Sequence, residues 1–133
     1  MAHSFINFRA QSSMFRDADV FLISGLLRSA GKNELTPELR PVIDTWFFGY
    51  DEFPSGAIDL QLDAHLTSQV AYESIIHSID AVVNTLNAQG STLSGEWLSE
   101  VLNDGEAVEY KDRLTVEVIE IINKFKSLLA ETK

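Results

Sequence analysis

The stretch LTVEVIEIINKFKSLL, residues 114–129, decides the fold class of this chain of 133 residues. Its apolar residues recur at intervals of three and four: Leu114, Val118, Ile121, Ile122, Phe125 and Leu129. Because a helix turns by about 100° per residue, this spacing places them on one face. We therefore predict an amphipathic helix whose apolar face packs against a core.

A longer helical pattern covers residues 68–87. The apolar residues that share one face of it are Tyr72, Ile75, Ile76, Ile79, Val82, Val83 and Leu86. Further helices are expected from Ser12 or Ser13 to Gly31, from Thr36 to about Phe48, and from Ser94 to Asn103. Thr36-Pro37 is a typical helix start, since a hydroxyl residue caps the backbone and proline fits the first helical position.

A different period appears between these helices. Apolar residues alternate with polar ones from Ile58 to Thr67, which is typical of a half-buried strand. This stretch could pair with residues 46–53 as a hairpin, or it could begin the next helix. The sequence thus predicts a mainly α protein with four to five helices and a small β-hairpin or strand around residues 46–66. We expect one compact domain over residues 1–133, in which Met1-Ala2-His3-Ser4 is of the kind that cloning leaves behind.

The acidic residues are unevenly distributed along the chain. Between Asp51 and Tyr110 there are eleven aspartates and glutamates but no lysine or arginine, and this block accounts for the net charge of −10. Such a block repels itself, and a basic partner would relieve that repulsion. It would also repel the phosphates of nucleic acids and anionic membranes. We therefore expect a basic protein partner, and neither nucleic acid nor membrane.

Aromatic residues accompany the acids at two places in this block. Tryptophan and tyrosine are frequent anchors of protein interfaces, and flanking carboxylates can pair with lysine or arginine of a partner. We expect Trp46, Phe47 and Phe48 to belong to the core. The predicted partner-binding residues are Tyr50, Asp51, Glu52, Glu96, Trp97, Glu100, Asp104, Glu106 and Glu109.

Two Glu-x-x-Glu pairs are candidate metal ligands: Glu106 with Glu109, and Glu117 with Glu120. Carboxylates on neighbouring helical turns can hold magnesium. The pattern resembles the acidic pairs of the all-α nucleotide pyrophosphatases of the MazG kind, and the resemblance implies magnesium held against a triphosphate. However, Arg113 and Lys124 lie four residues from these glutamates on a continuous helix, which favours a salt-bridged surface.

Other signs of catalysis are lacking in the sequence. There is no cysteine, no Gly-x-Ser-x-Gly elbow and no phosphate-cradling glycine loop, so we predict no catalytic residue, no metal and no cofactor. The N-terminus lacks the basic start and apolar stretch of a signal peptide, and we expect a cytoplasmic protein.

The function expected from these observations is inhibition. We expect a small acidic protein, not an enzyme, that binds a basic partner, such as an immunity protein that neutralises a nuclease-like bacterial toxin. Two alternatives stay open. One is a chaperone or adaptor for a basic client protein, and the other is the magnesium-dependent pyrophosphatase-like enzyme.

Overall fold

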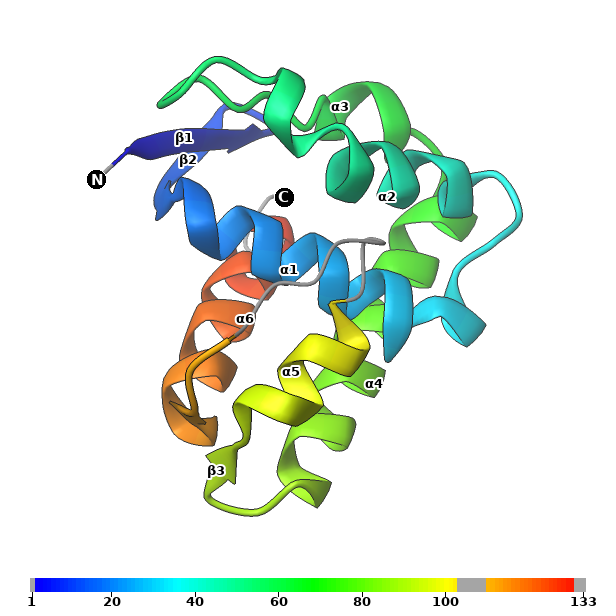
Figure 1. Ribbon diagram of the computed structural model, residues 1–133. Helices are drawn as coiled ribbons and strands as arrows, with labels where there is room; N and C mark the ends of the chain where they lie inside the picture. The colour runs from blue at the N-terminus through cyan, green and yellow to red at the C-terminus, as the bar shows by residue number, and fades with distance from the viewer. Residues whose placement is uncertain (1, 103–109, 131–133) are drawn as a thin grey trace.

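The computed structural model describes residues 2–102 and 110–130 (Figure 1). Within them lie six α-helices, two 3-10 helices and two small antiparallel sheets. Their order is β1 His3–Phe8, β2 Gln11–Arg16, α1 Asp17–Ser29, η1 Lys32–Glu34, α2 Leu39–Phe48, η2 Tyr50–Glu52, α3 Leu62–His65, α4 Gln69–Ala88, β3 Thr92–Leu93, α5 Gly95–Val101, β4 Arg113–Leu114 and α6 Thr115–Ala130. The mainly α class with a small hairpin is confirmed. The helix count exceeds the prediction because of the single turn α3.

The hairpin lies at the N-terminus and not around residues 46–66, so its predicted place is wrong. β1 pairs with β2, and Phe5 stands opposite Met14. Both turn residues between the strands, Arg9 and Ala10, have positive φ angles of 48° and 67°. Residues 12–16, predicted as the start of the first helix, belong to β2 because Ile6, Phe8 and Phe15 are buried together on the inner face of the sheet.

The alternating stretch after Gly56 forms no strand: residues 57–61 are irregular, and Leu62–His65 form the single helical turn α3. Ile58, Leu60 and Leu62 are buried, as the alternation predicts. The backbone here bonds to side chains instead of to a neighbouring strand. The amide of Ile58 donates to Ser4 Oγ at 3.0 Å, and the amide of Gln61 donates to Asp59 Oδ1 at 2.9 Å. Alternate burial of apolar residues therefore does not require pairing with a neighbouring strand.

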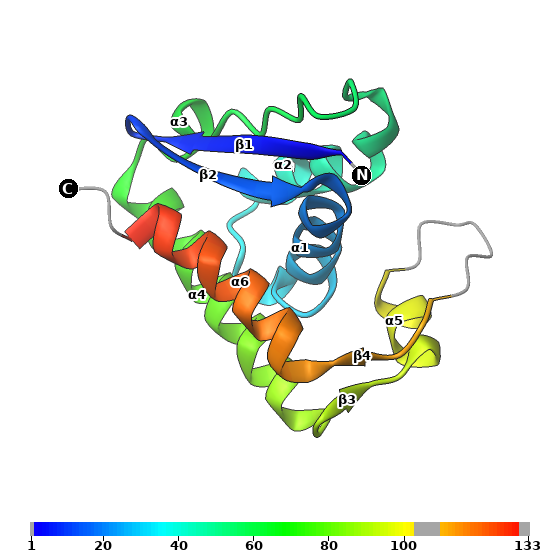
Figure 2. The same cartoon turned by 90° about the vertical axis from the view of Figure 1, so that its left-hand side faces the viewer.

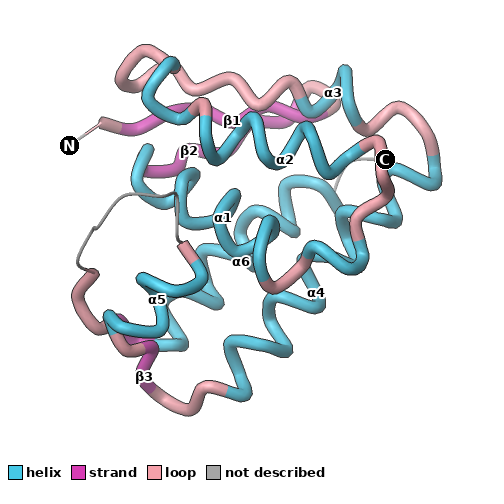
Figure 3. The backbone as a smooth tube through the Cα atoms, turned by 45° about the vertical axis from the view of Figure 1, so that its right-hand side comes forward, coloured by secondary structure: helices cyan, strands magenta, loops and turns pink. Residues whose placement is uncertain are grey.

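The helices surround one continuous core. Figure 2 shows α4 and α6 side by side below the β1–β2 hairpin, with α1 next to them. Figure 3 shows α2 on the other side of α1, close to α3 and the hairpin. Fully buried side chains come from every part of the fold: Phe8, Leu26, Phe47, Leu66, Ile75, Ile79 and Phe125. Both long amphipathic helices bury the face that their sequence period predicts, except that Leu114 lies in β4 and is 50% exposed.

The C-terminal helix begins only at Thr115, after β4, and this overturns the predicted salt-bridged face. Arg113 lies in β4, and its nitrogen is 3.9 Å from the Asp19 carboxylate of α1. Lys124 contacts the ring of Phe15 and donates to the carbonyl of Met14. Among the described residues neither base forms an ion pair with Glu117 or Glu120. Packing of α6 against β2 and α1 thus takes these bases away from the glutamates.

Candidate functional site

The predicted partner-binding residues are distributed over two separate elements. Tyr50 and Glu52 belong to η2, which directly follows α2, whereas Glu96, Trp97 and Glu100 belong to α5. In Figure 1, α2 and α5 lie on opposite sides of α1. Asp104, Glu106, Glu109 and the side chain of Asp51 lie outside the part of the chain that the structure describes. The described residues of the predicted set therefore form two separate candidate surfaces, one at η2 and one at α5.

The aromatic members of this set are anchors rather than free side chains. The ring of Tyr50 lies 5.0 Å from that of Phe21, which in turn stacks on Phe47 at 4.8 Å. Trp97 is half-buried against the core at the start of α5, where Ser94 Oγ accepts from its backbone amide at 3.1 Å. These contacts hold η2 and α5 in place and leave the acids beside them at the surface.

Several acids of the central block already have partners in the molecule. The carboxylate of Asp80 lies 2.7 Å from Lys126 Nζ, so one charge of the block is neutralised by α6. Asp63 accepts from the backbone amide of Arg9 at 2.9 Å, and Glu73 accepts from the side chain of Gln69 at 3.0 Å. The acids of the central block therefore do not form one surface patch, and some of them already have partners within the molecule.

Two other acids of the block meet in a pocket of about 330 Å³. We call it the acidic pocket; it is lined by Thr45, Trp46, Gly49, Glu52, Phe53, Asp59, Leu60, Gln61 and His65. Its carboxylates are those of Glu52 and Asp59, and its apolar wall is formed by Trp46, Phe53 and Leu60. None of the described residues that line it is lysine or arginine. The pocket thus carries negative charge beside an aromatic surface.

Local backbone structure holds this pocket in shape. Trp46 Nε1 donates to the carbonyl of Leu60 at 3.2 Å, which ties α2 to the irregular segment 57–61. Asp59 accepts from the amide of Gln61, and Gln61 has a positive φ of 53°. A non-glycine residue in this conformation is uncommon and costs about 1–3 kcal/mol, and such residues cluster at functional sites.

The pocket also lies at the C-terminal end of α2. The helix ends at Phe48 with Gly49 as its cap, and a Cβ atom at Gly49 would lie 3.8 Å from Glu52 Oε2. The C-terminus of a helix carries a partial negative charge of about −0.5 and favours cations. The partial negative charge of the helix end therefore adds to that of the two carboxylates, and the pocket suits a positively charged group.

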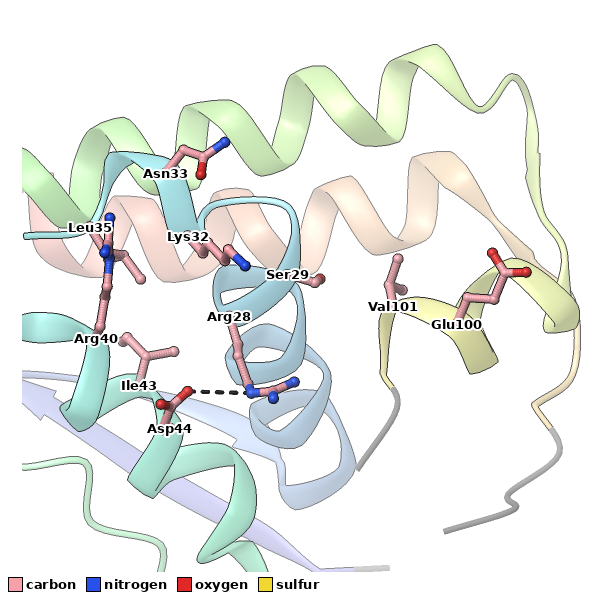
Figure 4. Close-up of a pocket in the computed structure, with 10 residues that line it drawn as sticks. All are labelled: Arg28, Ser29, Lys32, Asn33, Leu35, Arg40, Ile43, Asp44, Glu100 and Val101. Atoms are coloured by element: carbon pink, nitrogen blue, oxygen red, sulfur yellow. Dashed lines mark ion pairs between the residues drawn. The ribbon is translucent and has the colours of Figure 1, made fainter. Parts of the chain in front are cut away.

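A second pocket has the opposite character, and the sequence does not predict it. This cationic cleft, of about 740 Å³, lies between α1, α2 and α5 (Figure 4). Its lining residues are Arg28, Ser29, Lys32, Asn33, Leu35, Arg40, Ile43, Asp44, Glu100 and Val101. The first fifty residues have balanced charges, so nothing in the composition sets these bases apart. Only the fold brings Arg28, Lys32 and Arg40 to one cleft.

The glutamates of the pyrophosphatase alternative are exposed on α6. Glu117 and Glu120 are both accessible to solvent, and their predicted companions Glu106 and Glu109 lie outside the described residues. Within residues 2–102 and 110–130, no three histidine, aspartate or glutamate side chains stand close enough together to hold a metal ion. No helix in this part of the chain is long and apolar enough to cross a membrane.

No protein-family model matches the chain, and neither curated proteins nor solved structures show a significant match to it. The candidate sites therefore depend on their geometry and charge alone.

Proposed function

We propose that the protein is a small acidic inhibitor that binds a basic protein, in the way that an immunity protein neutralises a nuclease-like toxin. The observation that carries this proposal is the acidic pocket. Glu52 and Asp59 stand beside an aromatic wall, and no described lining residue is lysine or arginine. A nuclease carries lysine and arginine in the cleft that receives phosphate, and carboxylates can occupy that cleft instead.

The proposed contact is the insertion of one basic side chain of the partner into the acidic pocket. The aliphatic stem of a lysine or arginine would pack on the half-buried ring of Phe53, as such stems do on apolar surfaces. Its charged end would reach Glu52 and Asp59 at the end of α2. Arginine suits this arrangement best, because its planar guanidinium can bond to two carboxylates and stack on a ring.

A second contact would involve Glu96, Glu100 and the acids that follow α5 in the sequence. A standard interface buries about 800 Å² on each partner, which corresponds to roughly 20–30 residues. A partner of ordinary size can therefore cover the η2 surface or the α5 surface alone, or extend across both. We propose the η2 surface as the main contact because two block acids share a pocket there whose described lining contains no lysine or arginine.

The test is a comparison of charge-neutral variants. The basic partner is first captured from the native host and identified, and its affinity is then measured by calorimetry. We expect Glu52→Gln with Asp59→Asn to lower the affinity at least tenfold. The matched control, Glu73→Gln with Glu117→Gln, removes two exposed acids outside the pocket and should change the affinity less than threefold. Equal losses in both double variants, or none in the first, would refute binding through the acidic pocket.

One observation favours a second candidate, a chaperone or adaptor for a basic client. Phe5 and Met14 face each other across the hairpin, and they are 63% and 47% exposed. Exposed apolar side chains of this size are typical of surfaces that receive another chain. If this candidate is right, Phe5→Ser with Met14→Ser abolishes capture of the client, whereas the acidic-pocket variants still capture it.

A further inference from the structure

We propose that the cationic cleft binds a small phosphate-bearing ligand. Three positively charged residues from three consecutive elements line it: Arg28 of α1, Lys32 of η1 and Arg40 of α2. Its volume of about 740 Å³ is in the range of small-molecule sites, which is roughly 300–1,000 Å³. Phosphate is the natural ligand of such a set, because it accepts several charge-assisted hydrogen bonds at once.

Arg28 is held in position before any ligand arrives. Its Nε lies 3.3 Å from Asp44 Oδ1, and its guanidinium lies 4.3 Å from the ring centre of Phe48 and 5.2 Å from that of Phe47. The Nε atom is buried, yet it makes no hydrogen bond to a described residue. Figure 4 shows the terminal nitrogens of Arg28 beyond Asp44, toward the space between α1 and α5. A preorganised fork of donors of this kind loses little entropy on binding.

Lys32 and Arg40 supply charge that the described part of the molecule leaves uncompensated. Both side chains are exposed, and neither forms an ion pair or a hydrogen bond with any of residues 2–102 or 110–130. They lie on either side of the bend between η1 and α2. Both bases line the cationic cleft, and a bound anion would neutralise the charge that they bring to it.

The opposite wall indicates what else the ligand carries. Glu100 of α5 lines the same cleft, across from the bases. A carboxylate disfavours a ligand that is negative along its whole length, and it accepts hydrogen bonds from hydroxyl groups. The arrangement therefore fits a phosphate monoester with hydroxyl groups at its other end, such as a sugar phosphate.

The experiment uses ribose 5-phosphate as the probe, with ribose and with sodium chloride of equal ionic strength as blanks. We expect ribose 5-phosphate, but not the blanks, to raise the melting temperature and to give a saturable calorimetric isotherm. Lys32→Gln and Arg40→Gln should each weaken this binding at least fivefold. Lys111→Gln removes an exposed base that does not line the cleft, and it should leave the affinity within twofold.

Three outcomes would overturn the proposal. The first is the lack of saturable binding to the wild-type protein at millimolar probe, with inorganic phosphate and pyrophosphate equally inert. The second is an equal loss of affinity in Lys111→Gln, which would mean general charge attraction. The third is a wild-type melting temperature that the probe and sodium chloride raise alike, which would assign the three bases to internal neutralisation. None of these measurements involves the basic partner, so they leave the inhibitor proposal untouched.

Discussion

The Nε atom of Arg28 lies 3.3 Å from the Oδ1 atom of Asp44, and this pair ties the end of α1 to the middle of α2. The two side chains are 31% and 54% exposed, so water competes for both charges. The pair stands where the cationic cleft opens. Its main effect is therefore to orient Arg28 and not to stabilise the fold.

The first prediction concerns how much the Arg28–Asp44 pair stabilises the protein. We expect Arg28→Ala to destabilise the protein more than Asp44→Ala, because Arg28 also loses its contacts with the rings of Phe47 and Phe48. The coupling energy of the pair should stay below about 1 kcal/mol, as is usual for exposed ion pairs. Urea unfolding of both single variants and the double variant measures it. A coupling of 2 kcal/mol or more would show that the pair is a major stabilising contact.

The second prediction concerns the buried hydroxyl of Ser4. Ser4 Oγ donates to Asp17 Oδ1 at 2.6 Å and accepts from the Ile58 amide at 3.0 Å. Ser4→Ala leaves both groups without this partner, and each unsatisfied buried group costs about 1–3 kcal/mol. We expect a loss of at least 1 kcal/mol and faster hydrogen exchange at the Ile58 amide. Ser12→Ala is the control, because Ser12 Oγ bonds to Asn7 at the exposed end of the same hairpin.

Ser4 does not line the acidic pocket, but it bonds to Ile58, which directly precedes the lining residue Asp59. The segment that it fixes continues into Asp59, Leu60 and Gln61, which line the pocket. Ser4→Ala should therefore weaken the binding of a basic partner as well. Unchanged exchange at Ile58 in this variant would mean that the other bond of Asp17, from the Gly56 amide at 2.8 Å, holds the segment alone.

The third prediction tests the contact between α1, α2 and α5. A Cβ atom at Gly25 would stand 2.2 Å from Leu102 Cδ2 and 2.9 Å from Phe47 Cε1. Overpacking of this kind costs about 1–3 kcal/mol, and alanine regains about 1 kcal/mol of helix propensity. We expect Gly25→Ala to destabilise the protein by about 1 kcal/mol.

Leu102→Ala supplies the control for this prediction, because it empties the space that the new methyl group needs. The double variant should lose clearly less stability than the sum of the two single losses. Additive losses would show that Gly25 and Leu102 are not in tight contact. Urea unfolding at one protein concentration is sufficient for all three variants.

How much the sequence predicts depends on the range of the interactions involved. The amphipathic helices α4 and α6 follow from local periodicity, and Ser68 and Ser94 cap α4 and α5 as hydroxyl residues should. The hairpin does not follow, because Arg9 and Ala10 adopt positive φ angles that normally call for glycine or asparagine. Exposed Phe5 further hides the alternation of β1.

The candidate sites were predictable only in part. The sequence predicts Glu52 as a partner-binding residue because of its aromatic surroundings, and Glu52 does line a pocket. Asp59 was not selected, because its place beside Glu52 depends on the bond from Trp46 Nε1 to the carbonyl of Leu60. The sequence does not predict the cationic cleft either, because the charge balance along the chain does not determine which charged residues lie close together in the fold.

Helix α2 relates the two sites to each other. Its first six residues include Arg40, Ile43 and Asp44, which line the cationic cleft, and Thr45 and Trp46, which follow them, line the acidic pocket. The macrodipole of a helix favours anions near the N-terminus and cations near the C-terminus. Each site therefore lies toward the end of α2 whose partial charge supports the ligand proposed for it.

The last prediction concerns the rate at which the basic partner associates. A net charge of −10 should attract a cationic protein over a distance, and such steering raises association rates by about 10- to 1,000-fold. Raising the ionic strength from about 0.01 to 0.15 M shortens the screening length from about 30 to about 8 Å. We expect the association rate constant to fall at least tenfold over this range, while the dissociation rate constant changes much less.

Stopped-flow fluorescence can follow this association through Trp46, whose indole borders the acidic pocket. A Trp97→Phe background leaves Trp46 as the single tryptophan of the chain. Glu52→Gln with Asp59→Asn should speed dissociation more than it slows association, since it removes a close contact but only two of the twenty acidic charges. An association rate that does not respond to salt would show that the acidic block plays no part in bringing the partner to the pocket.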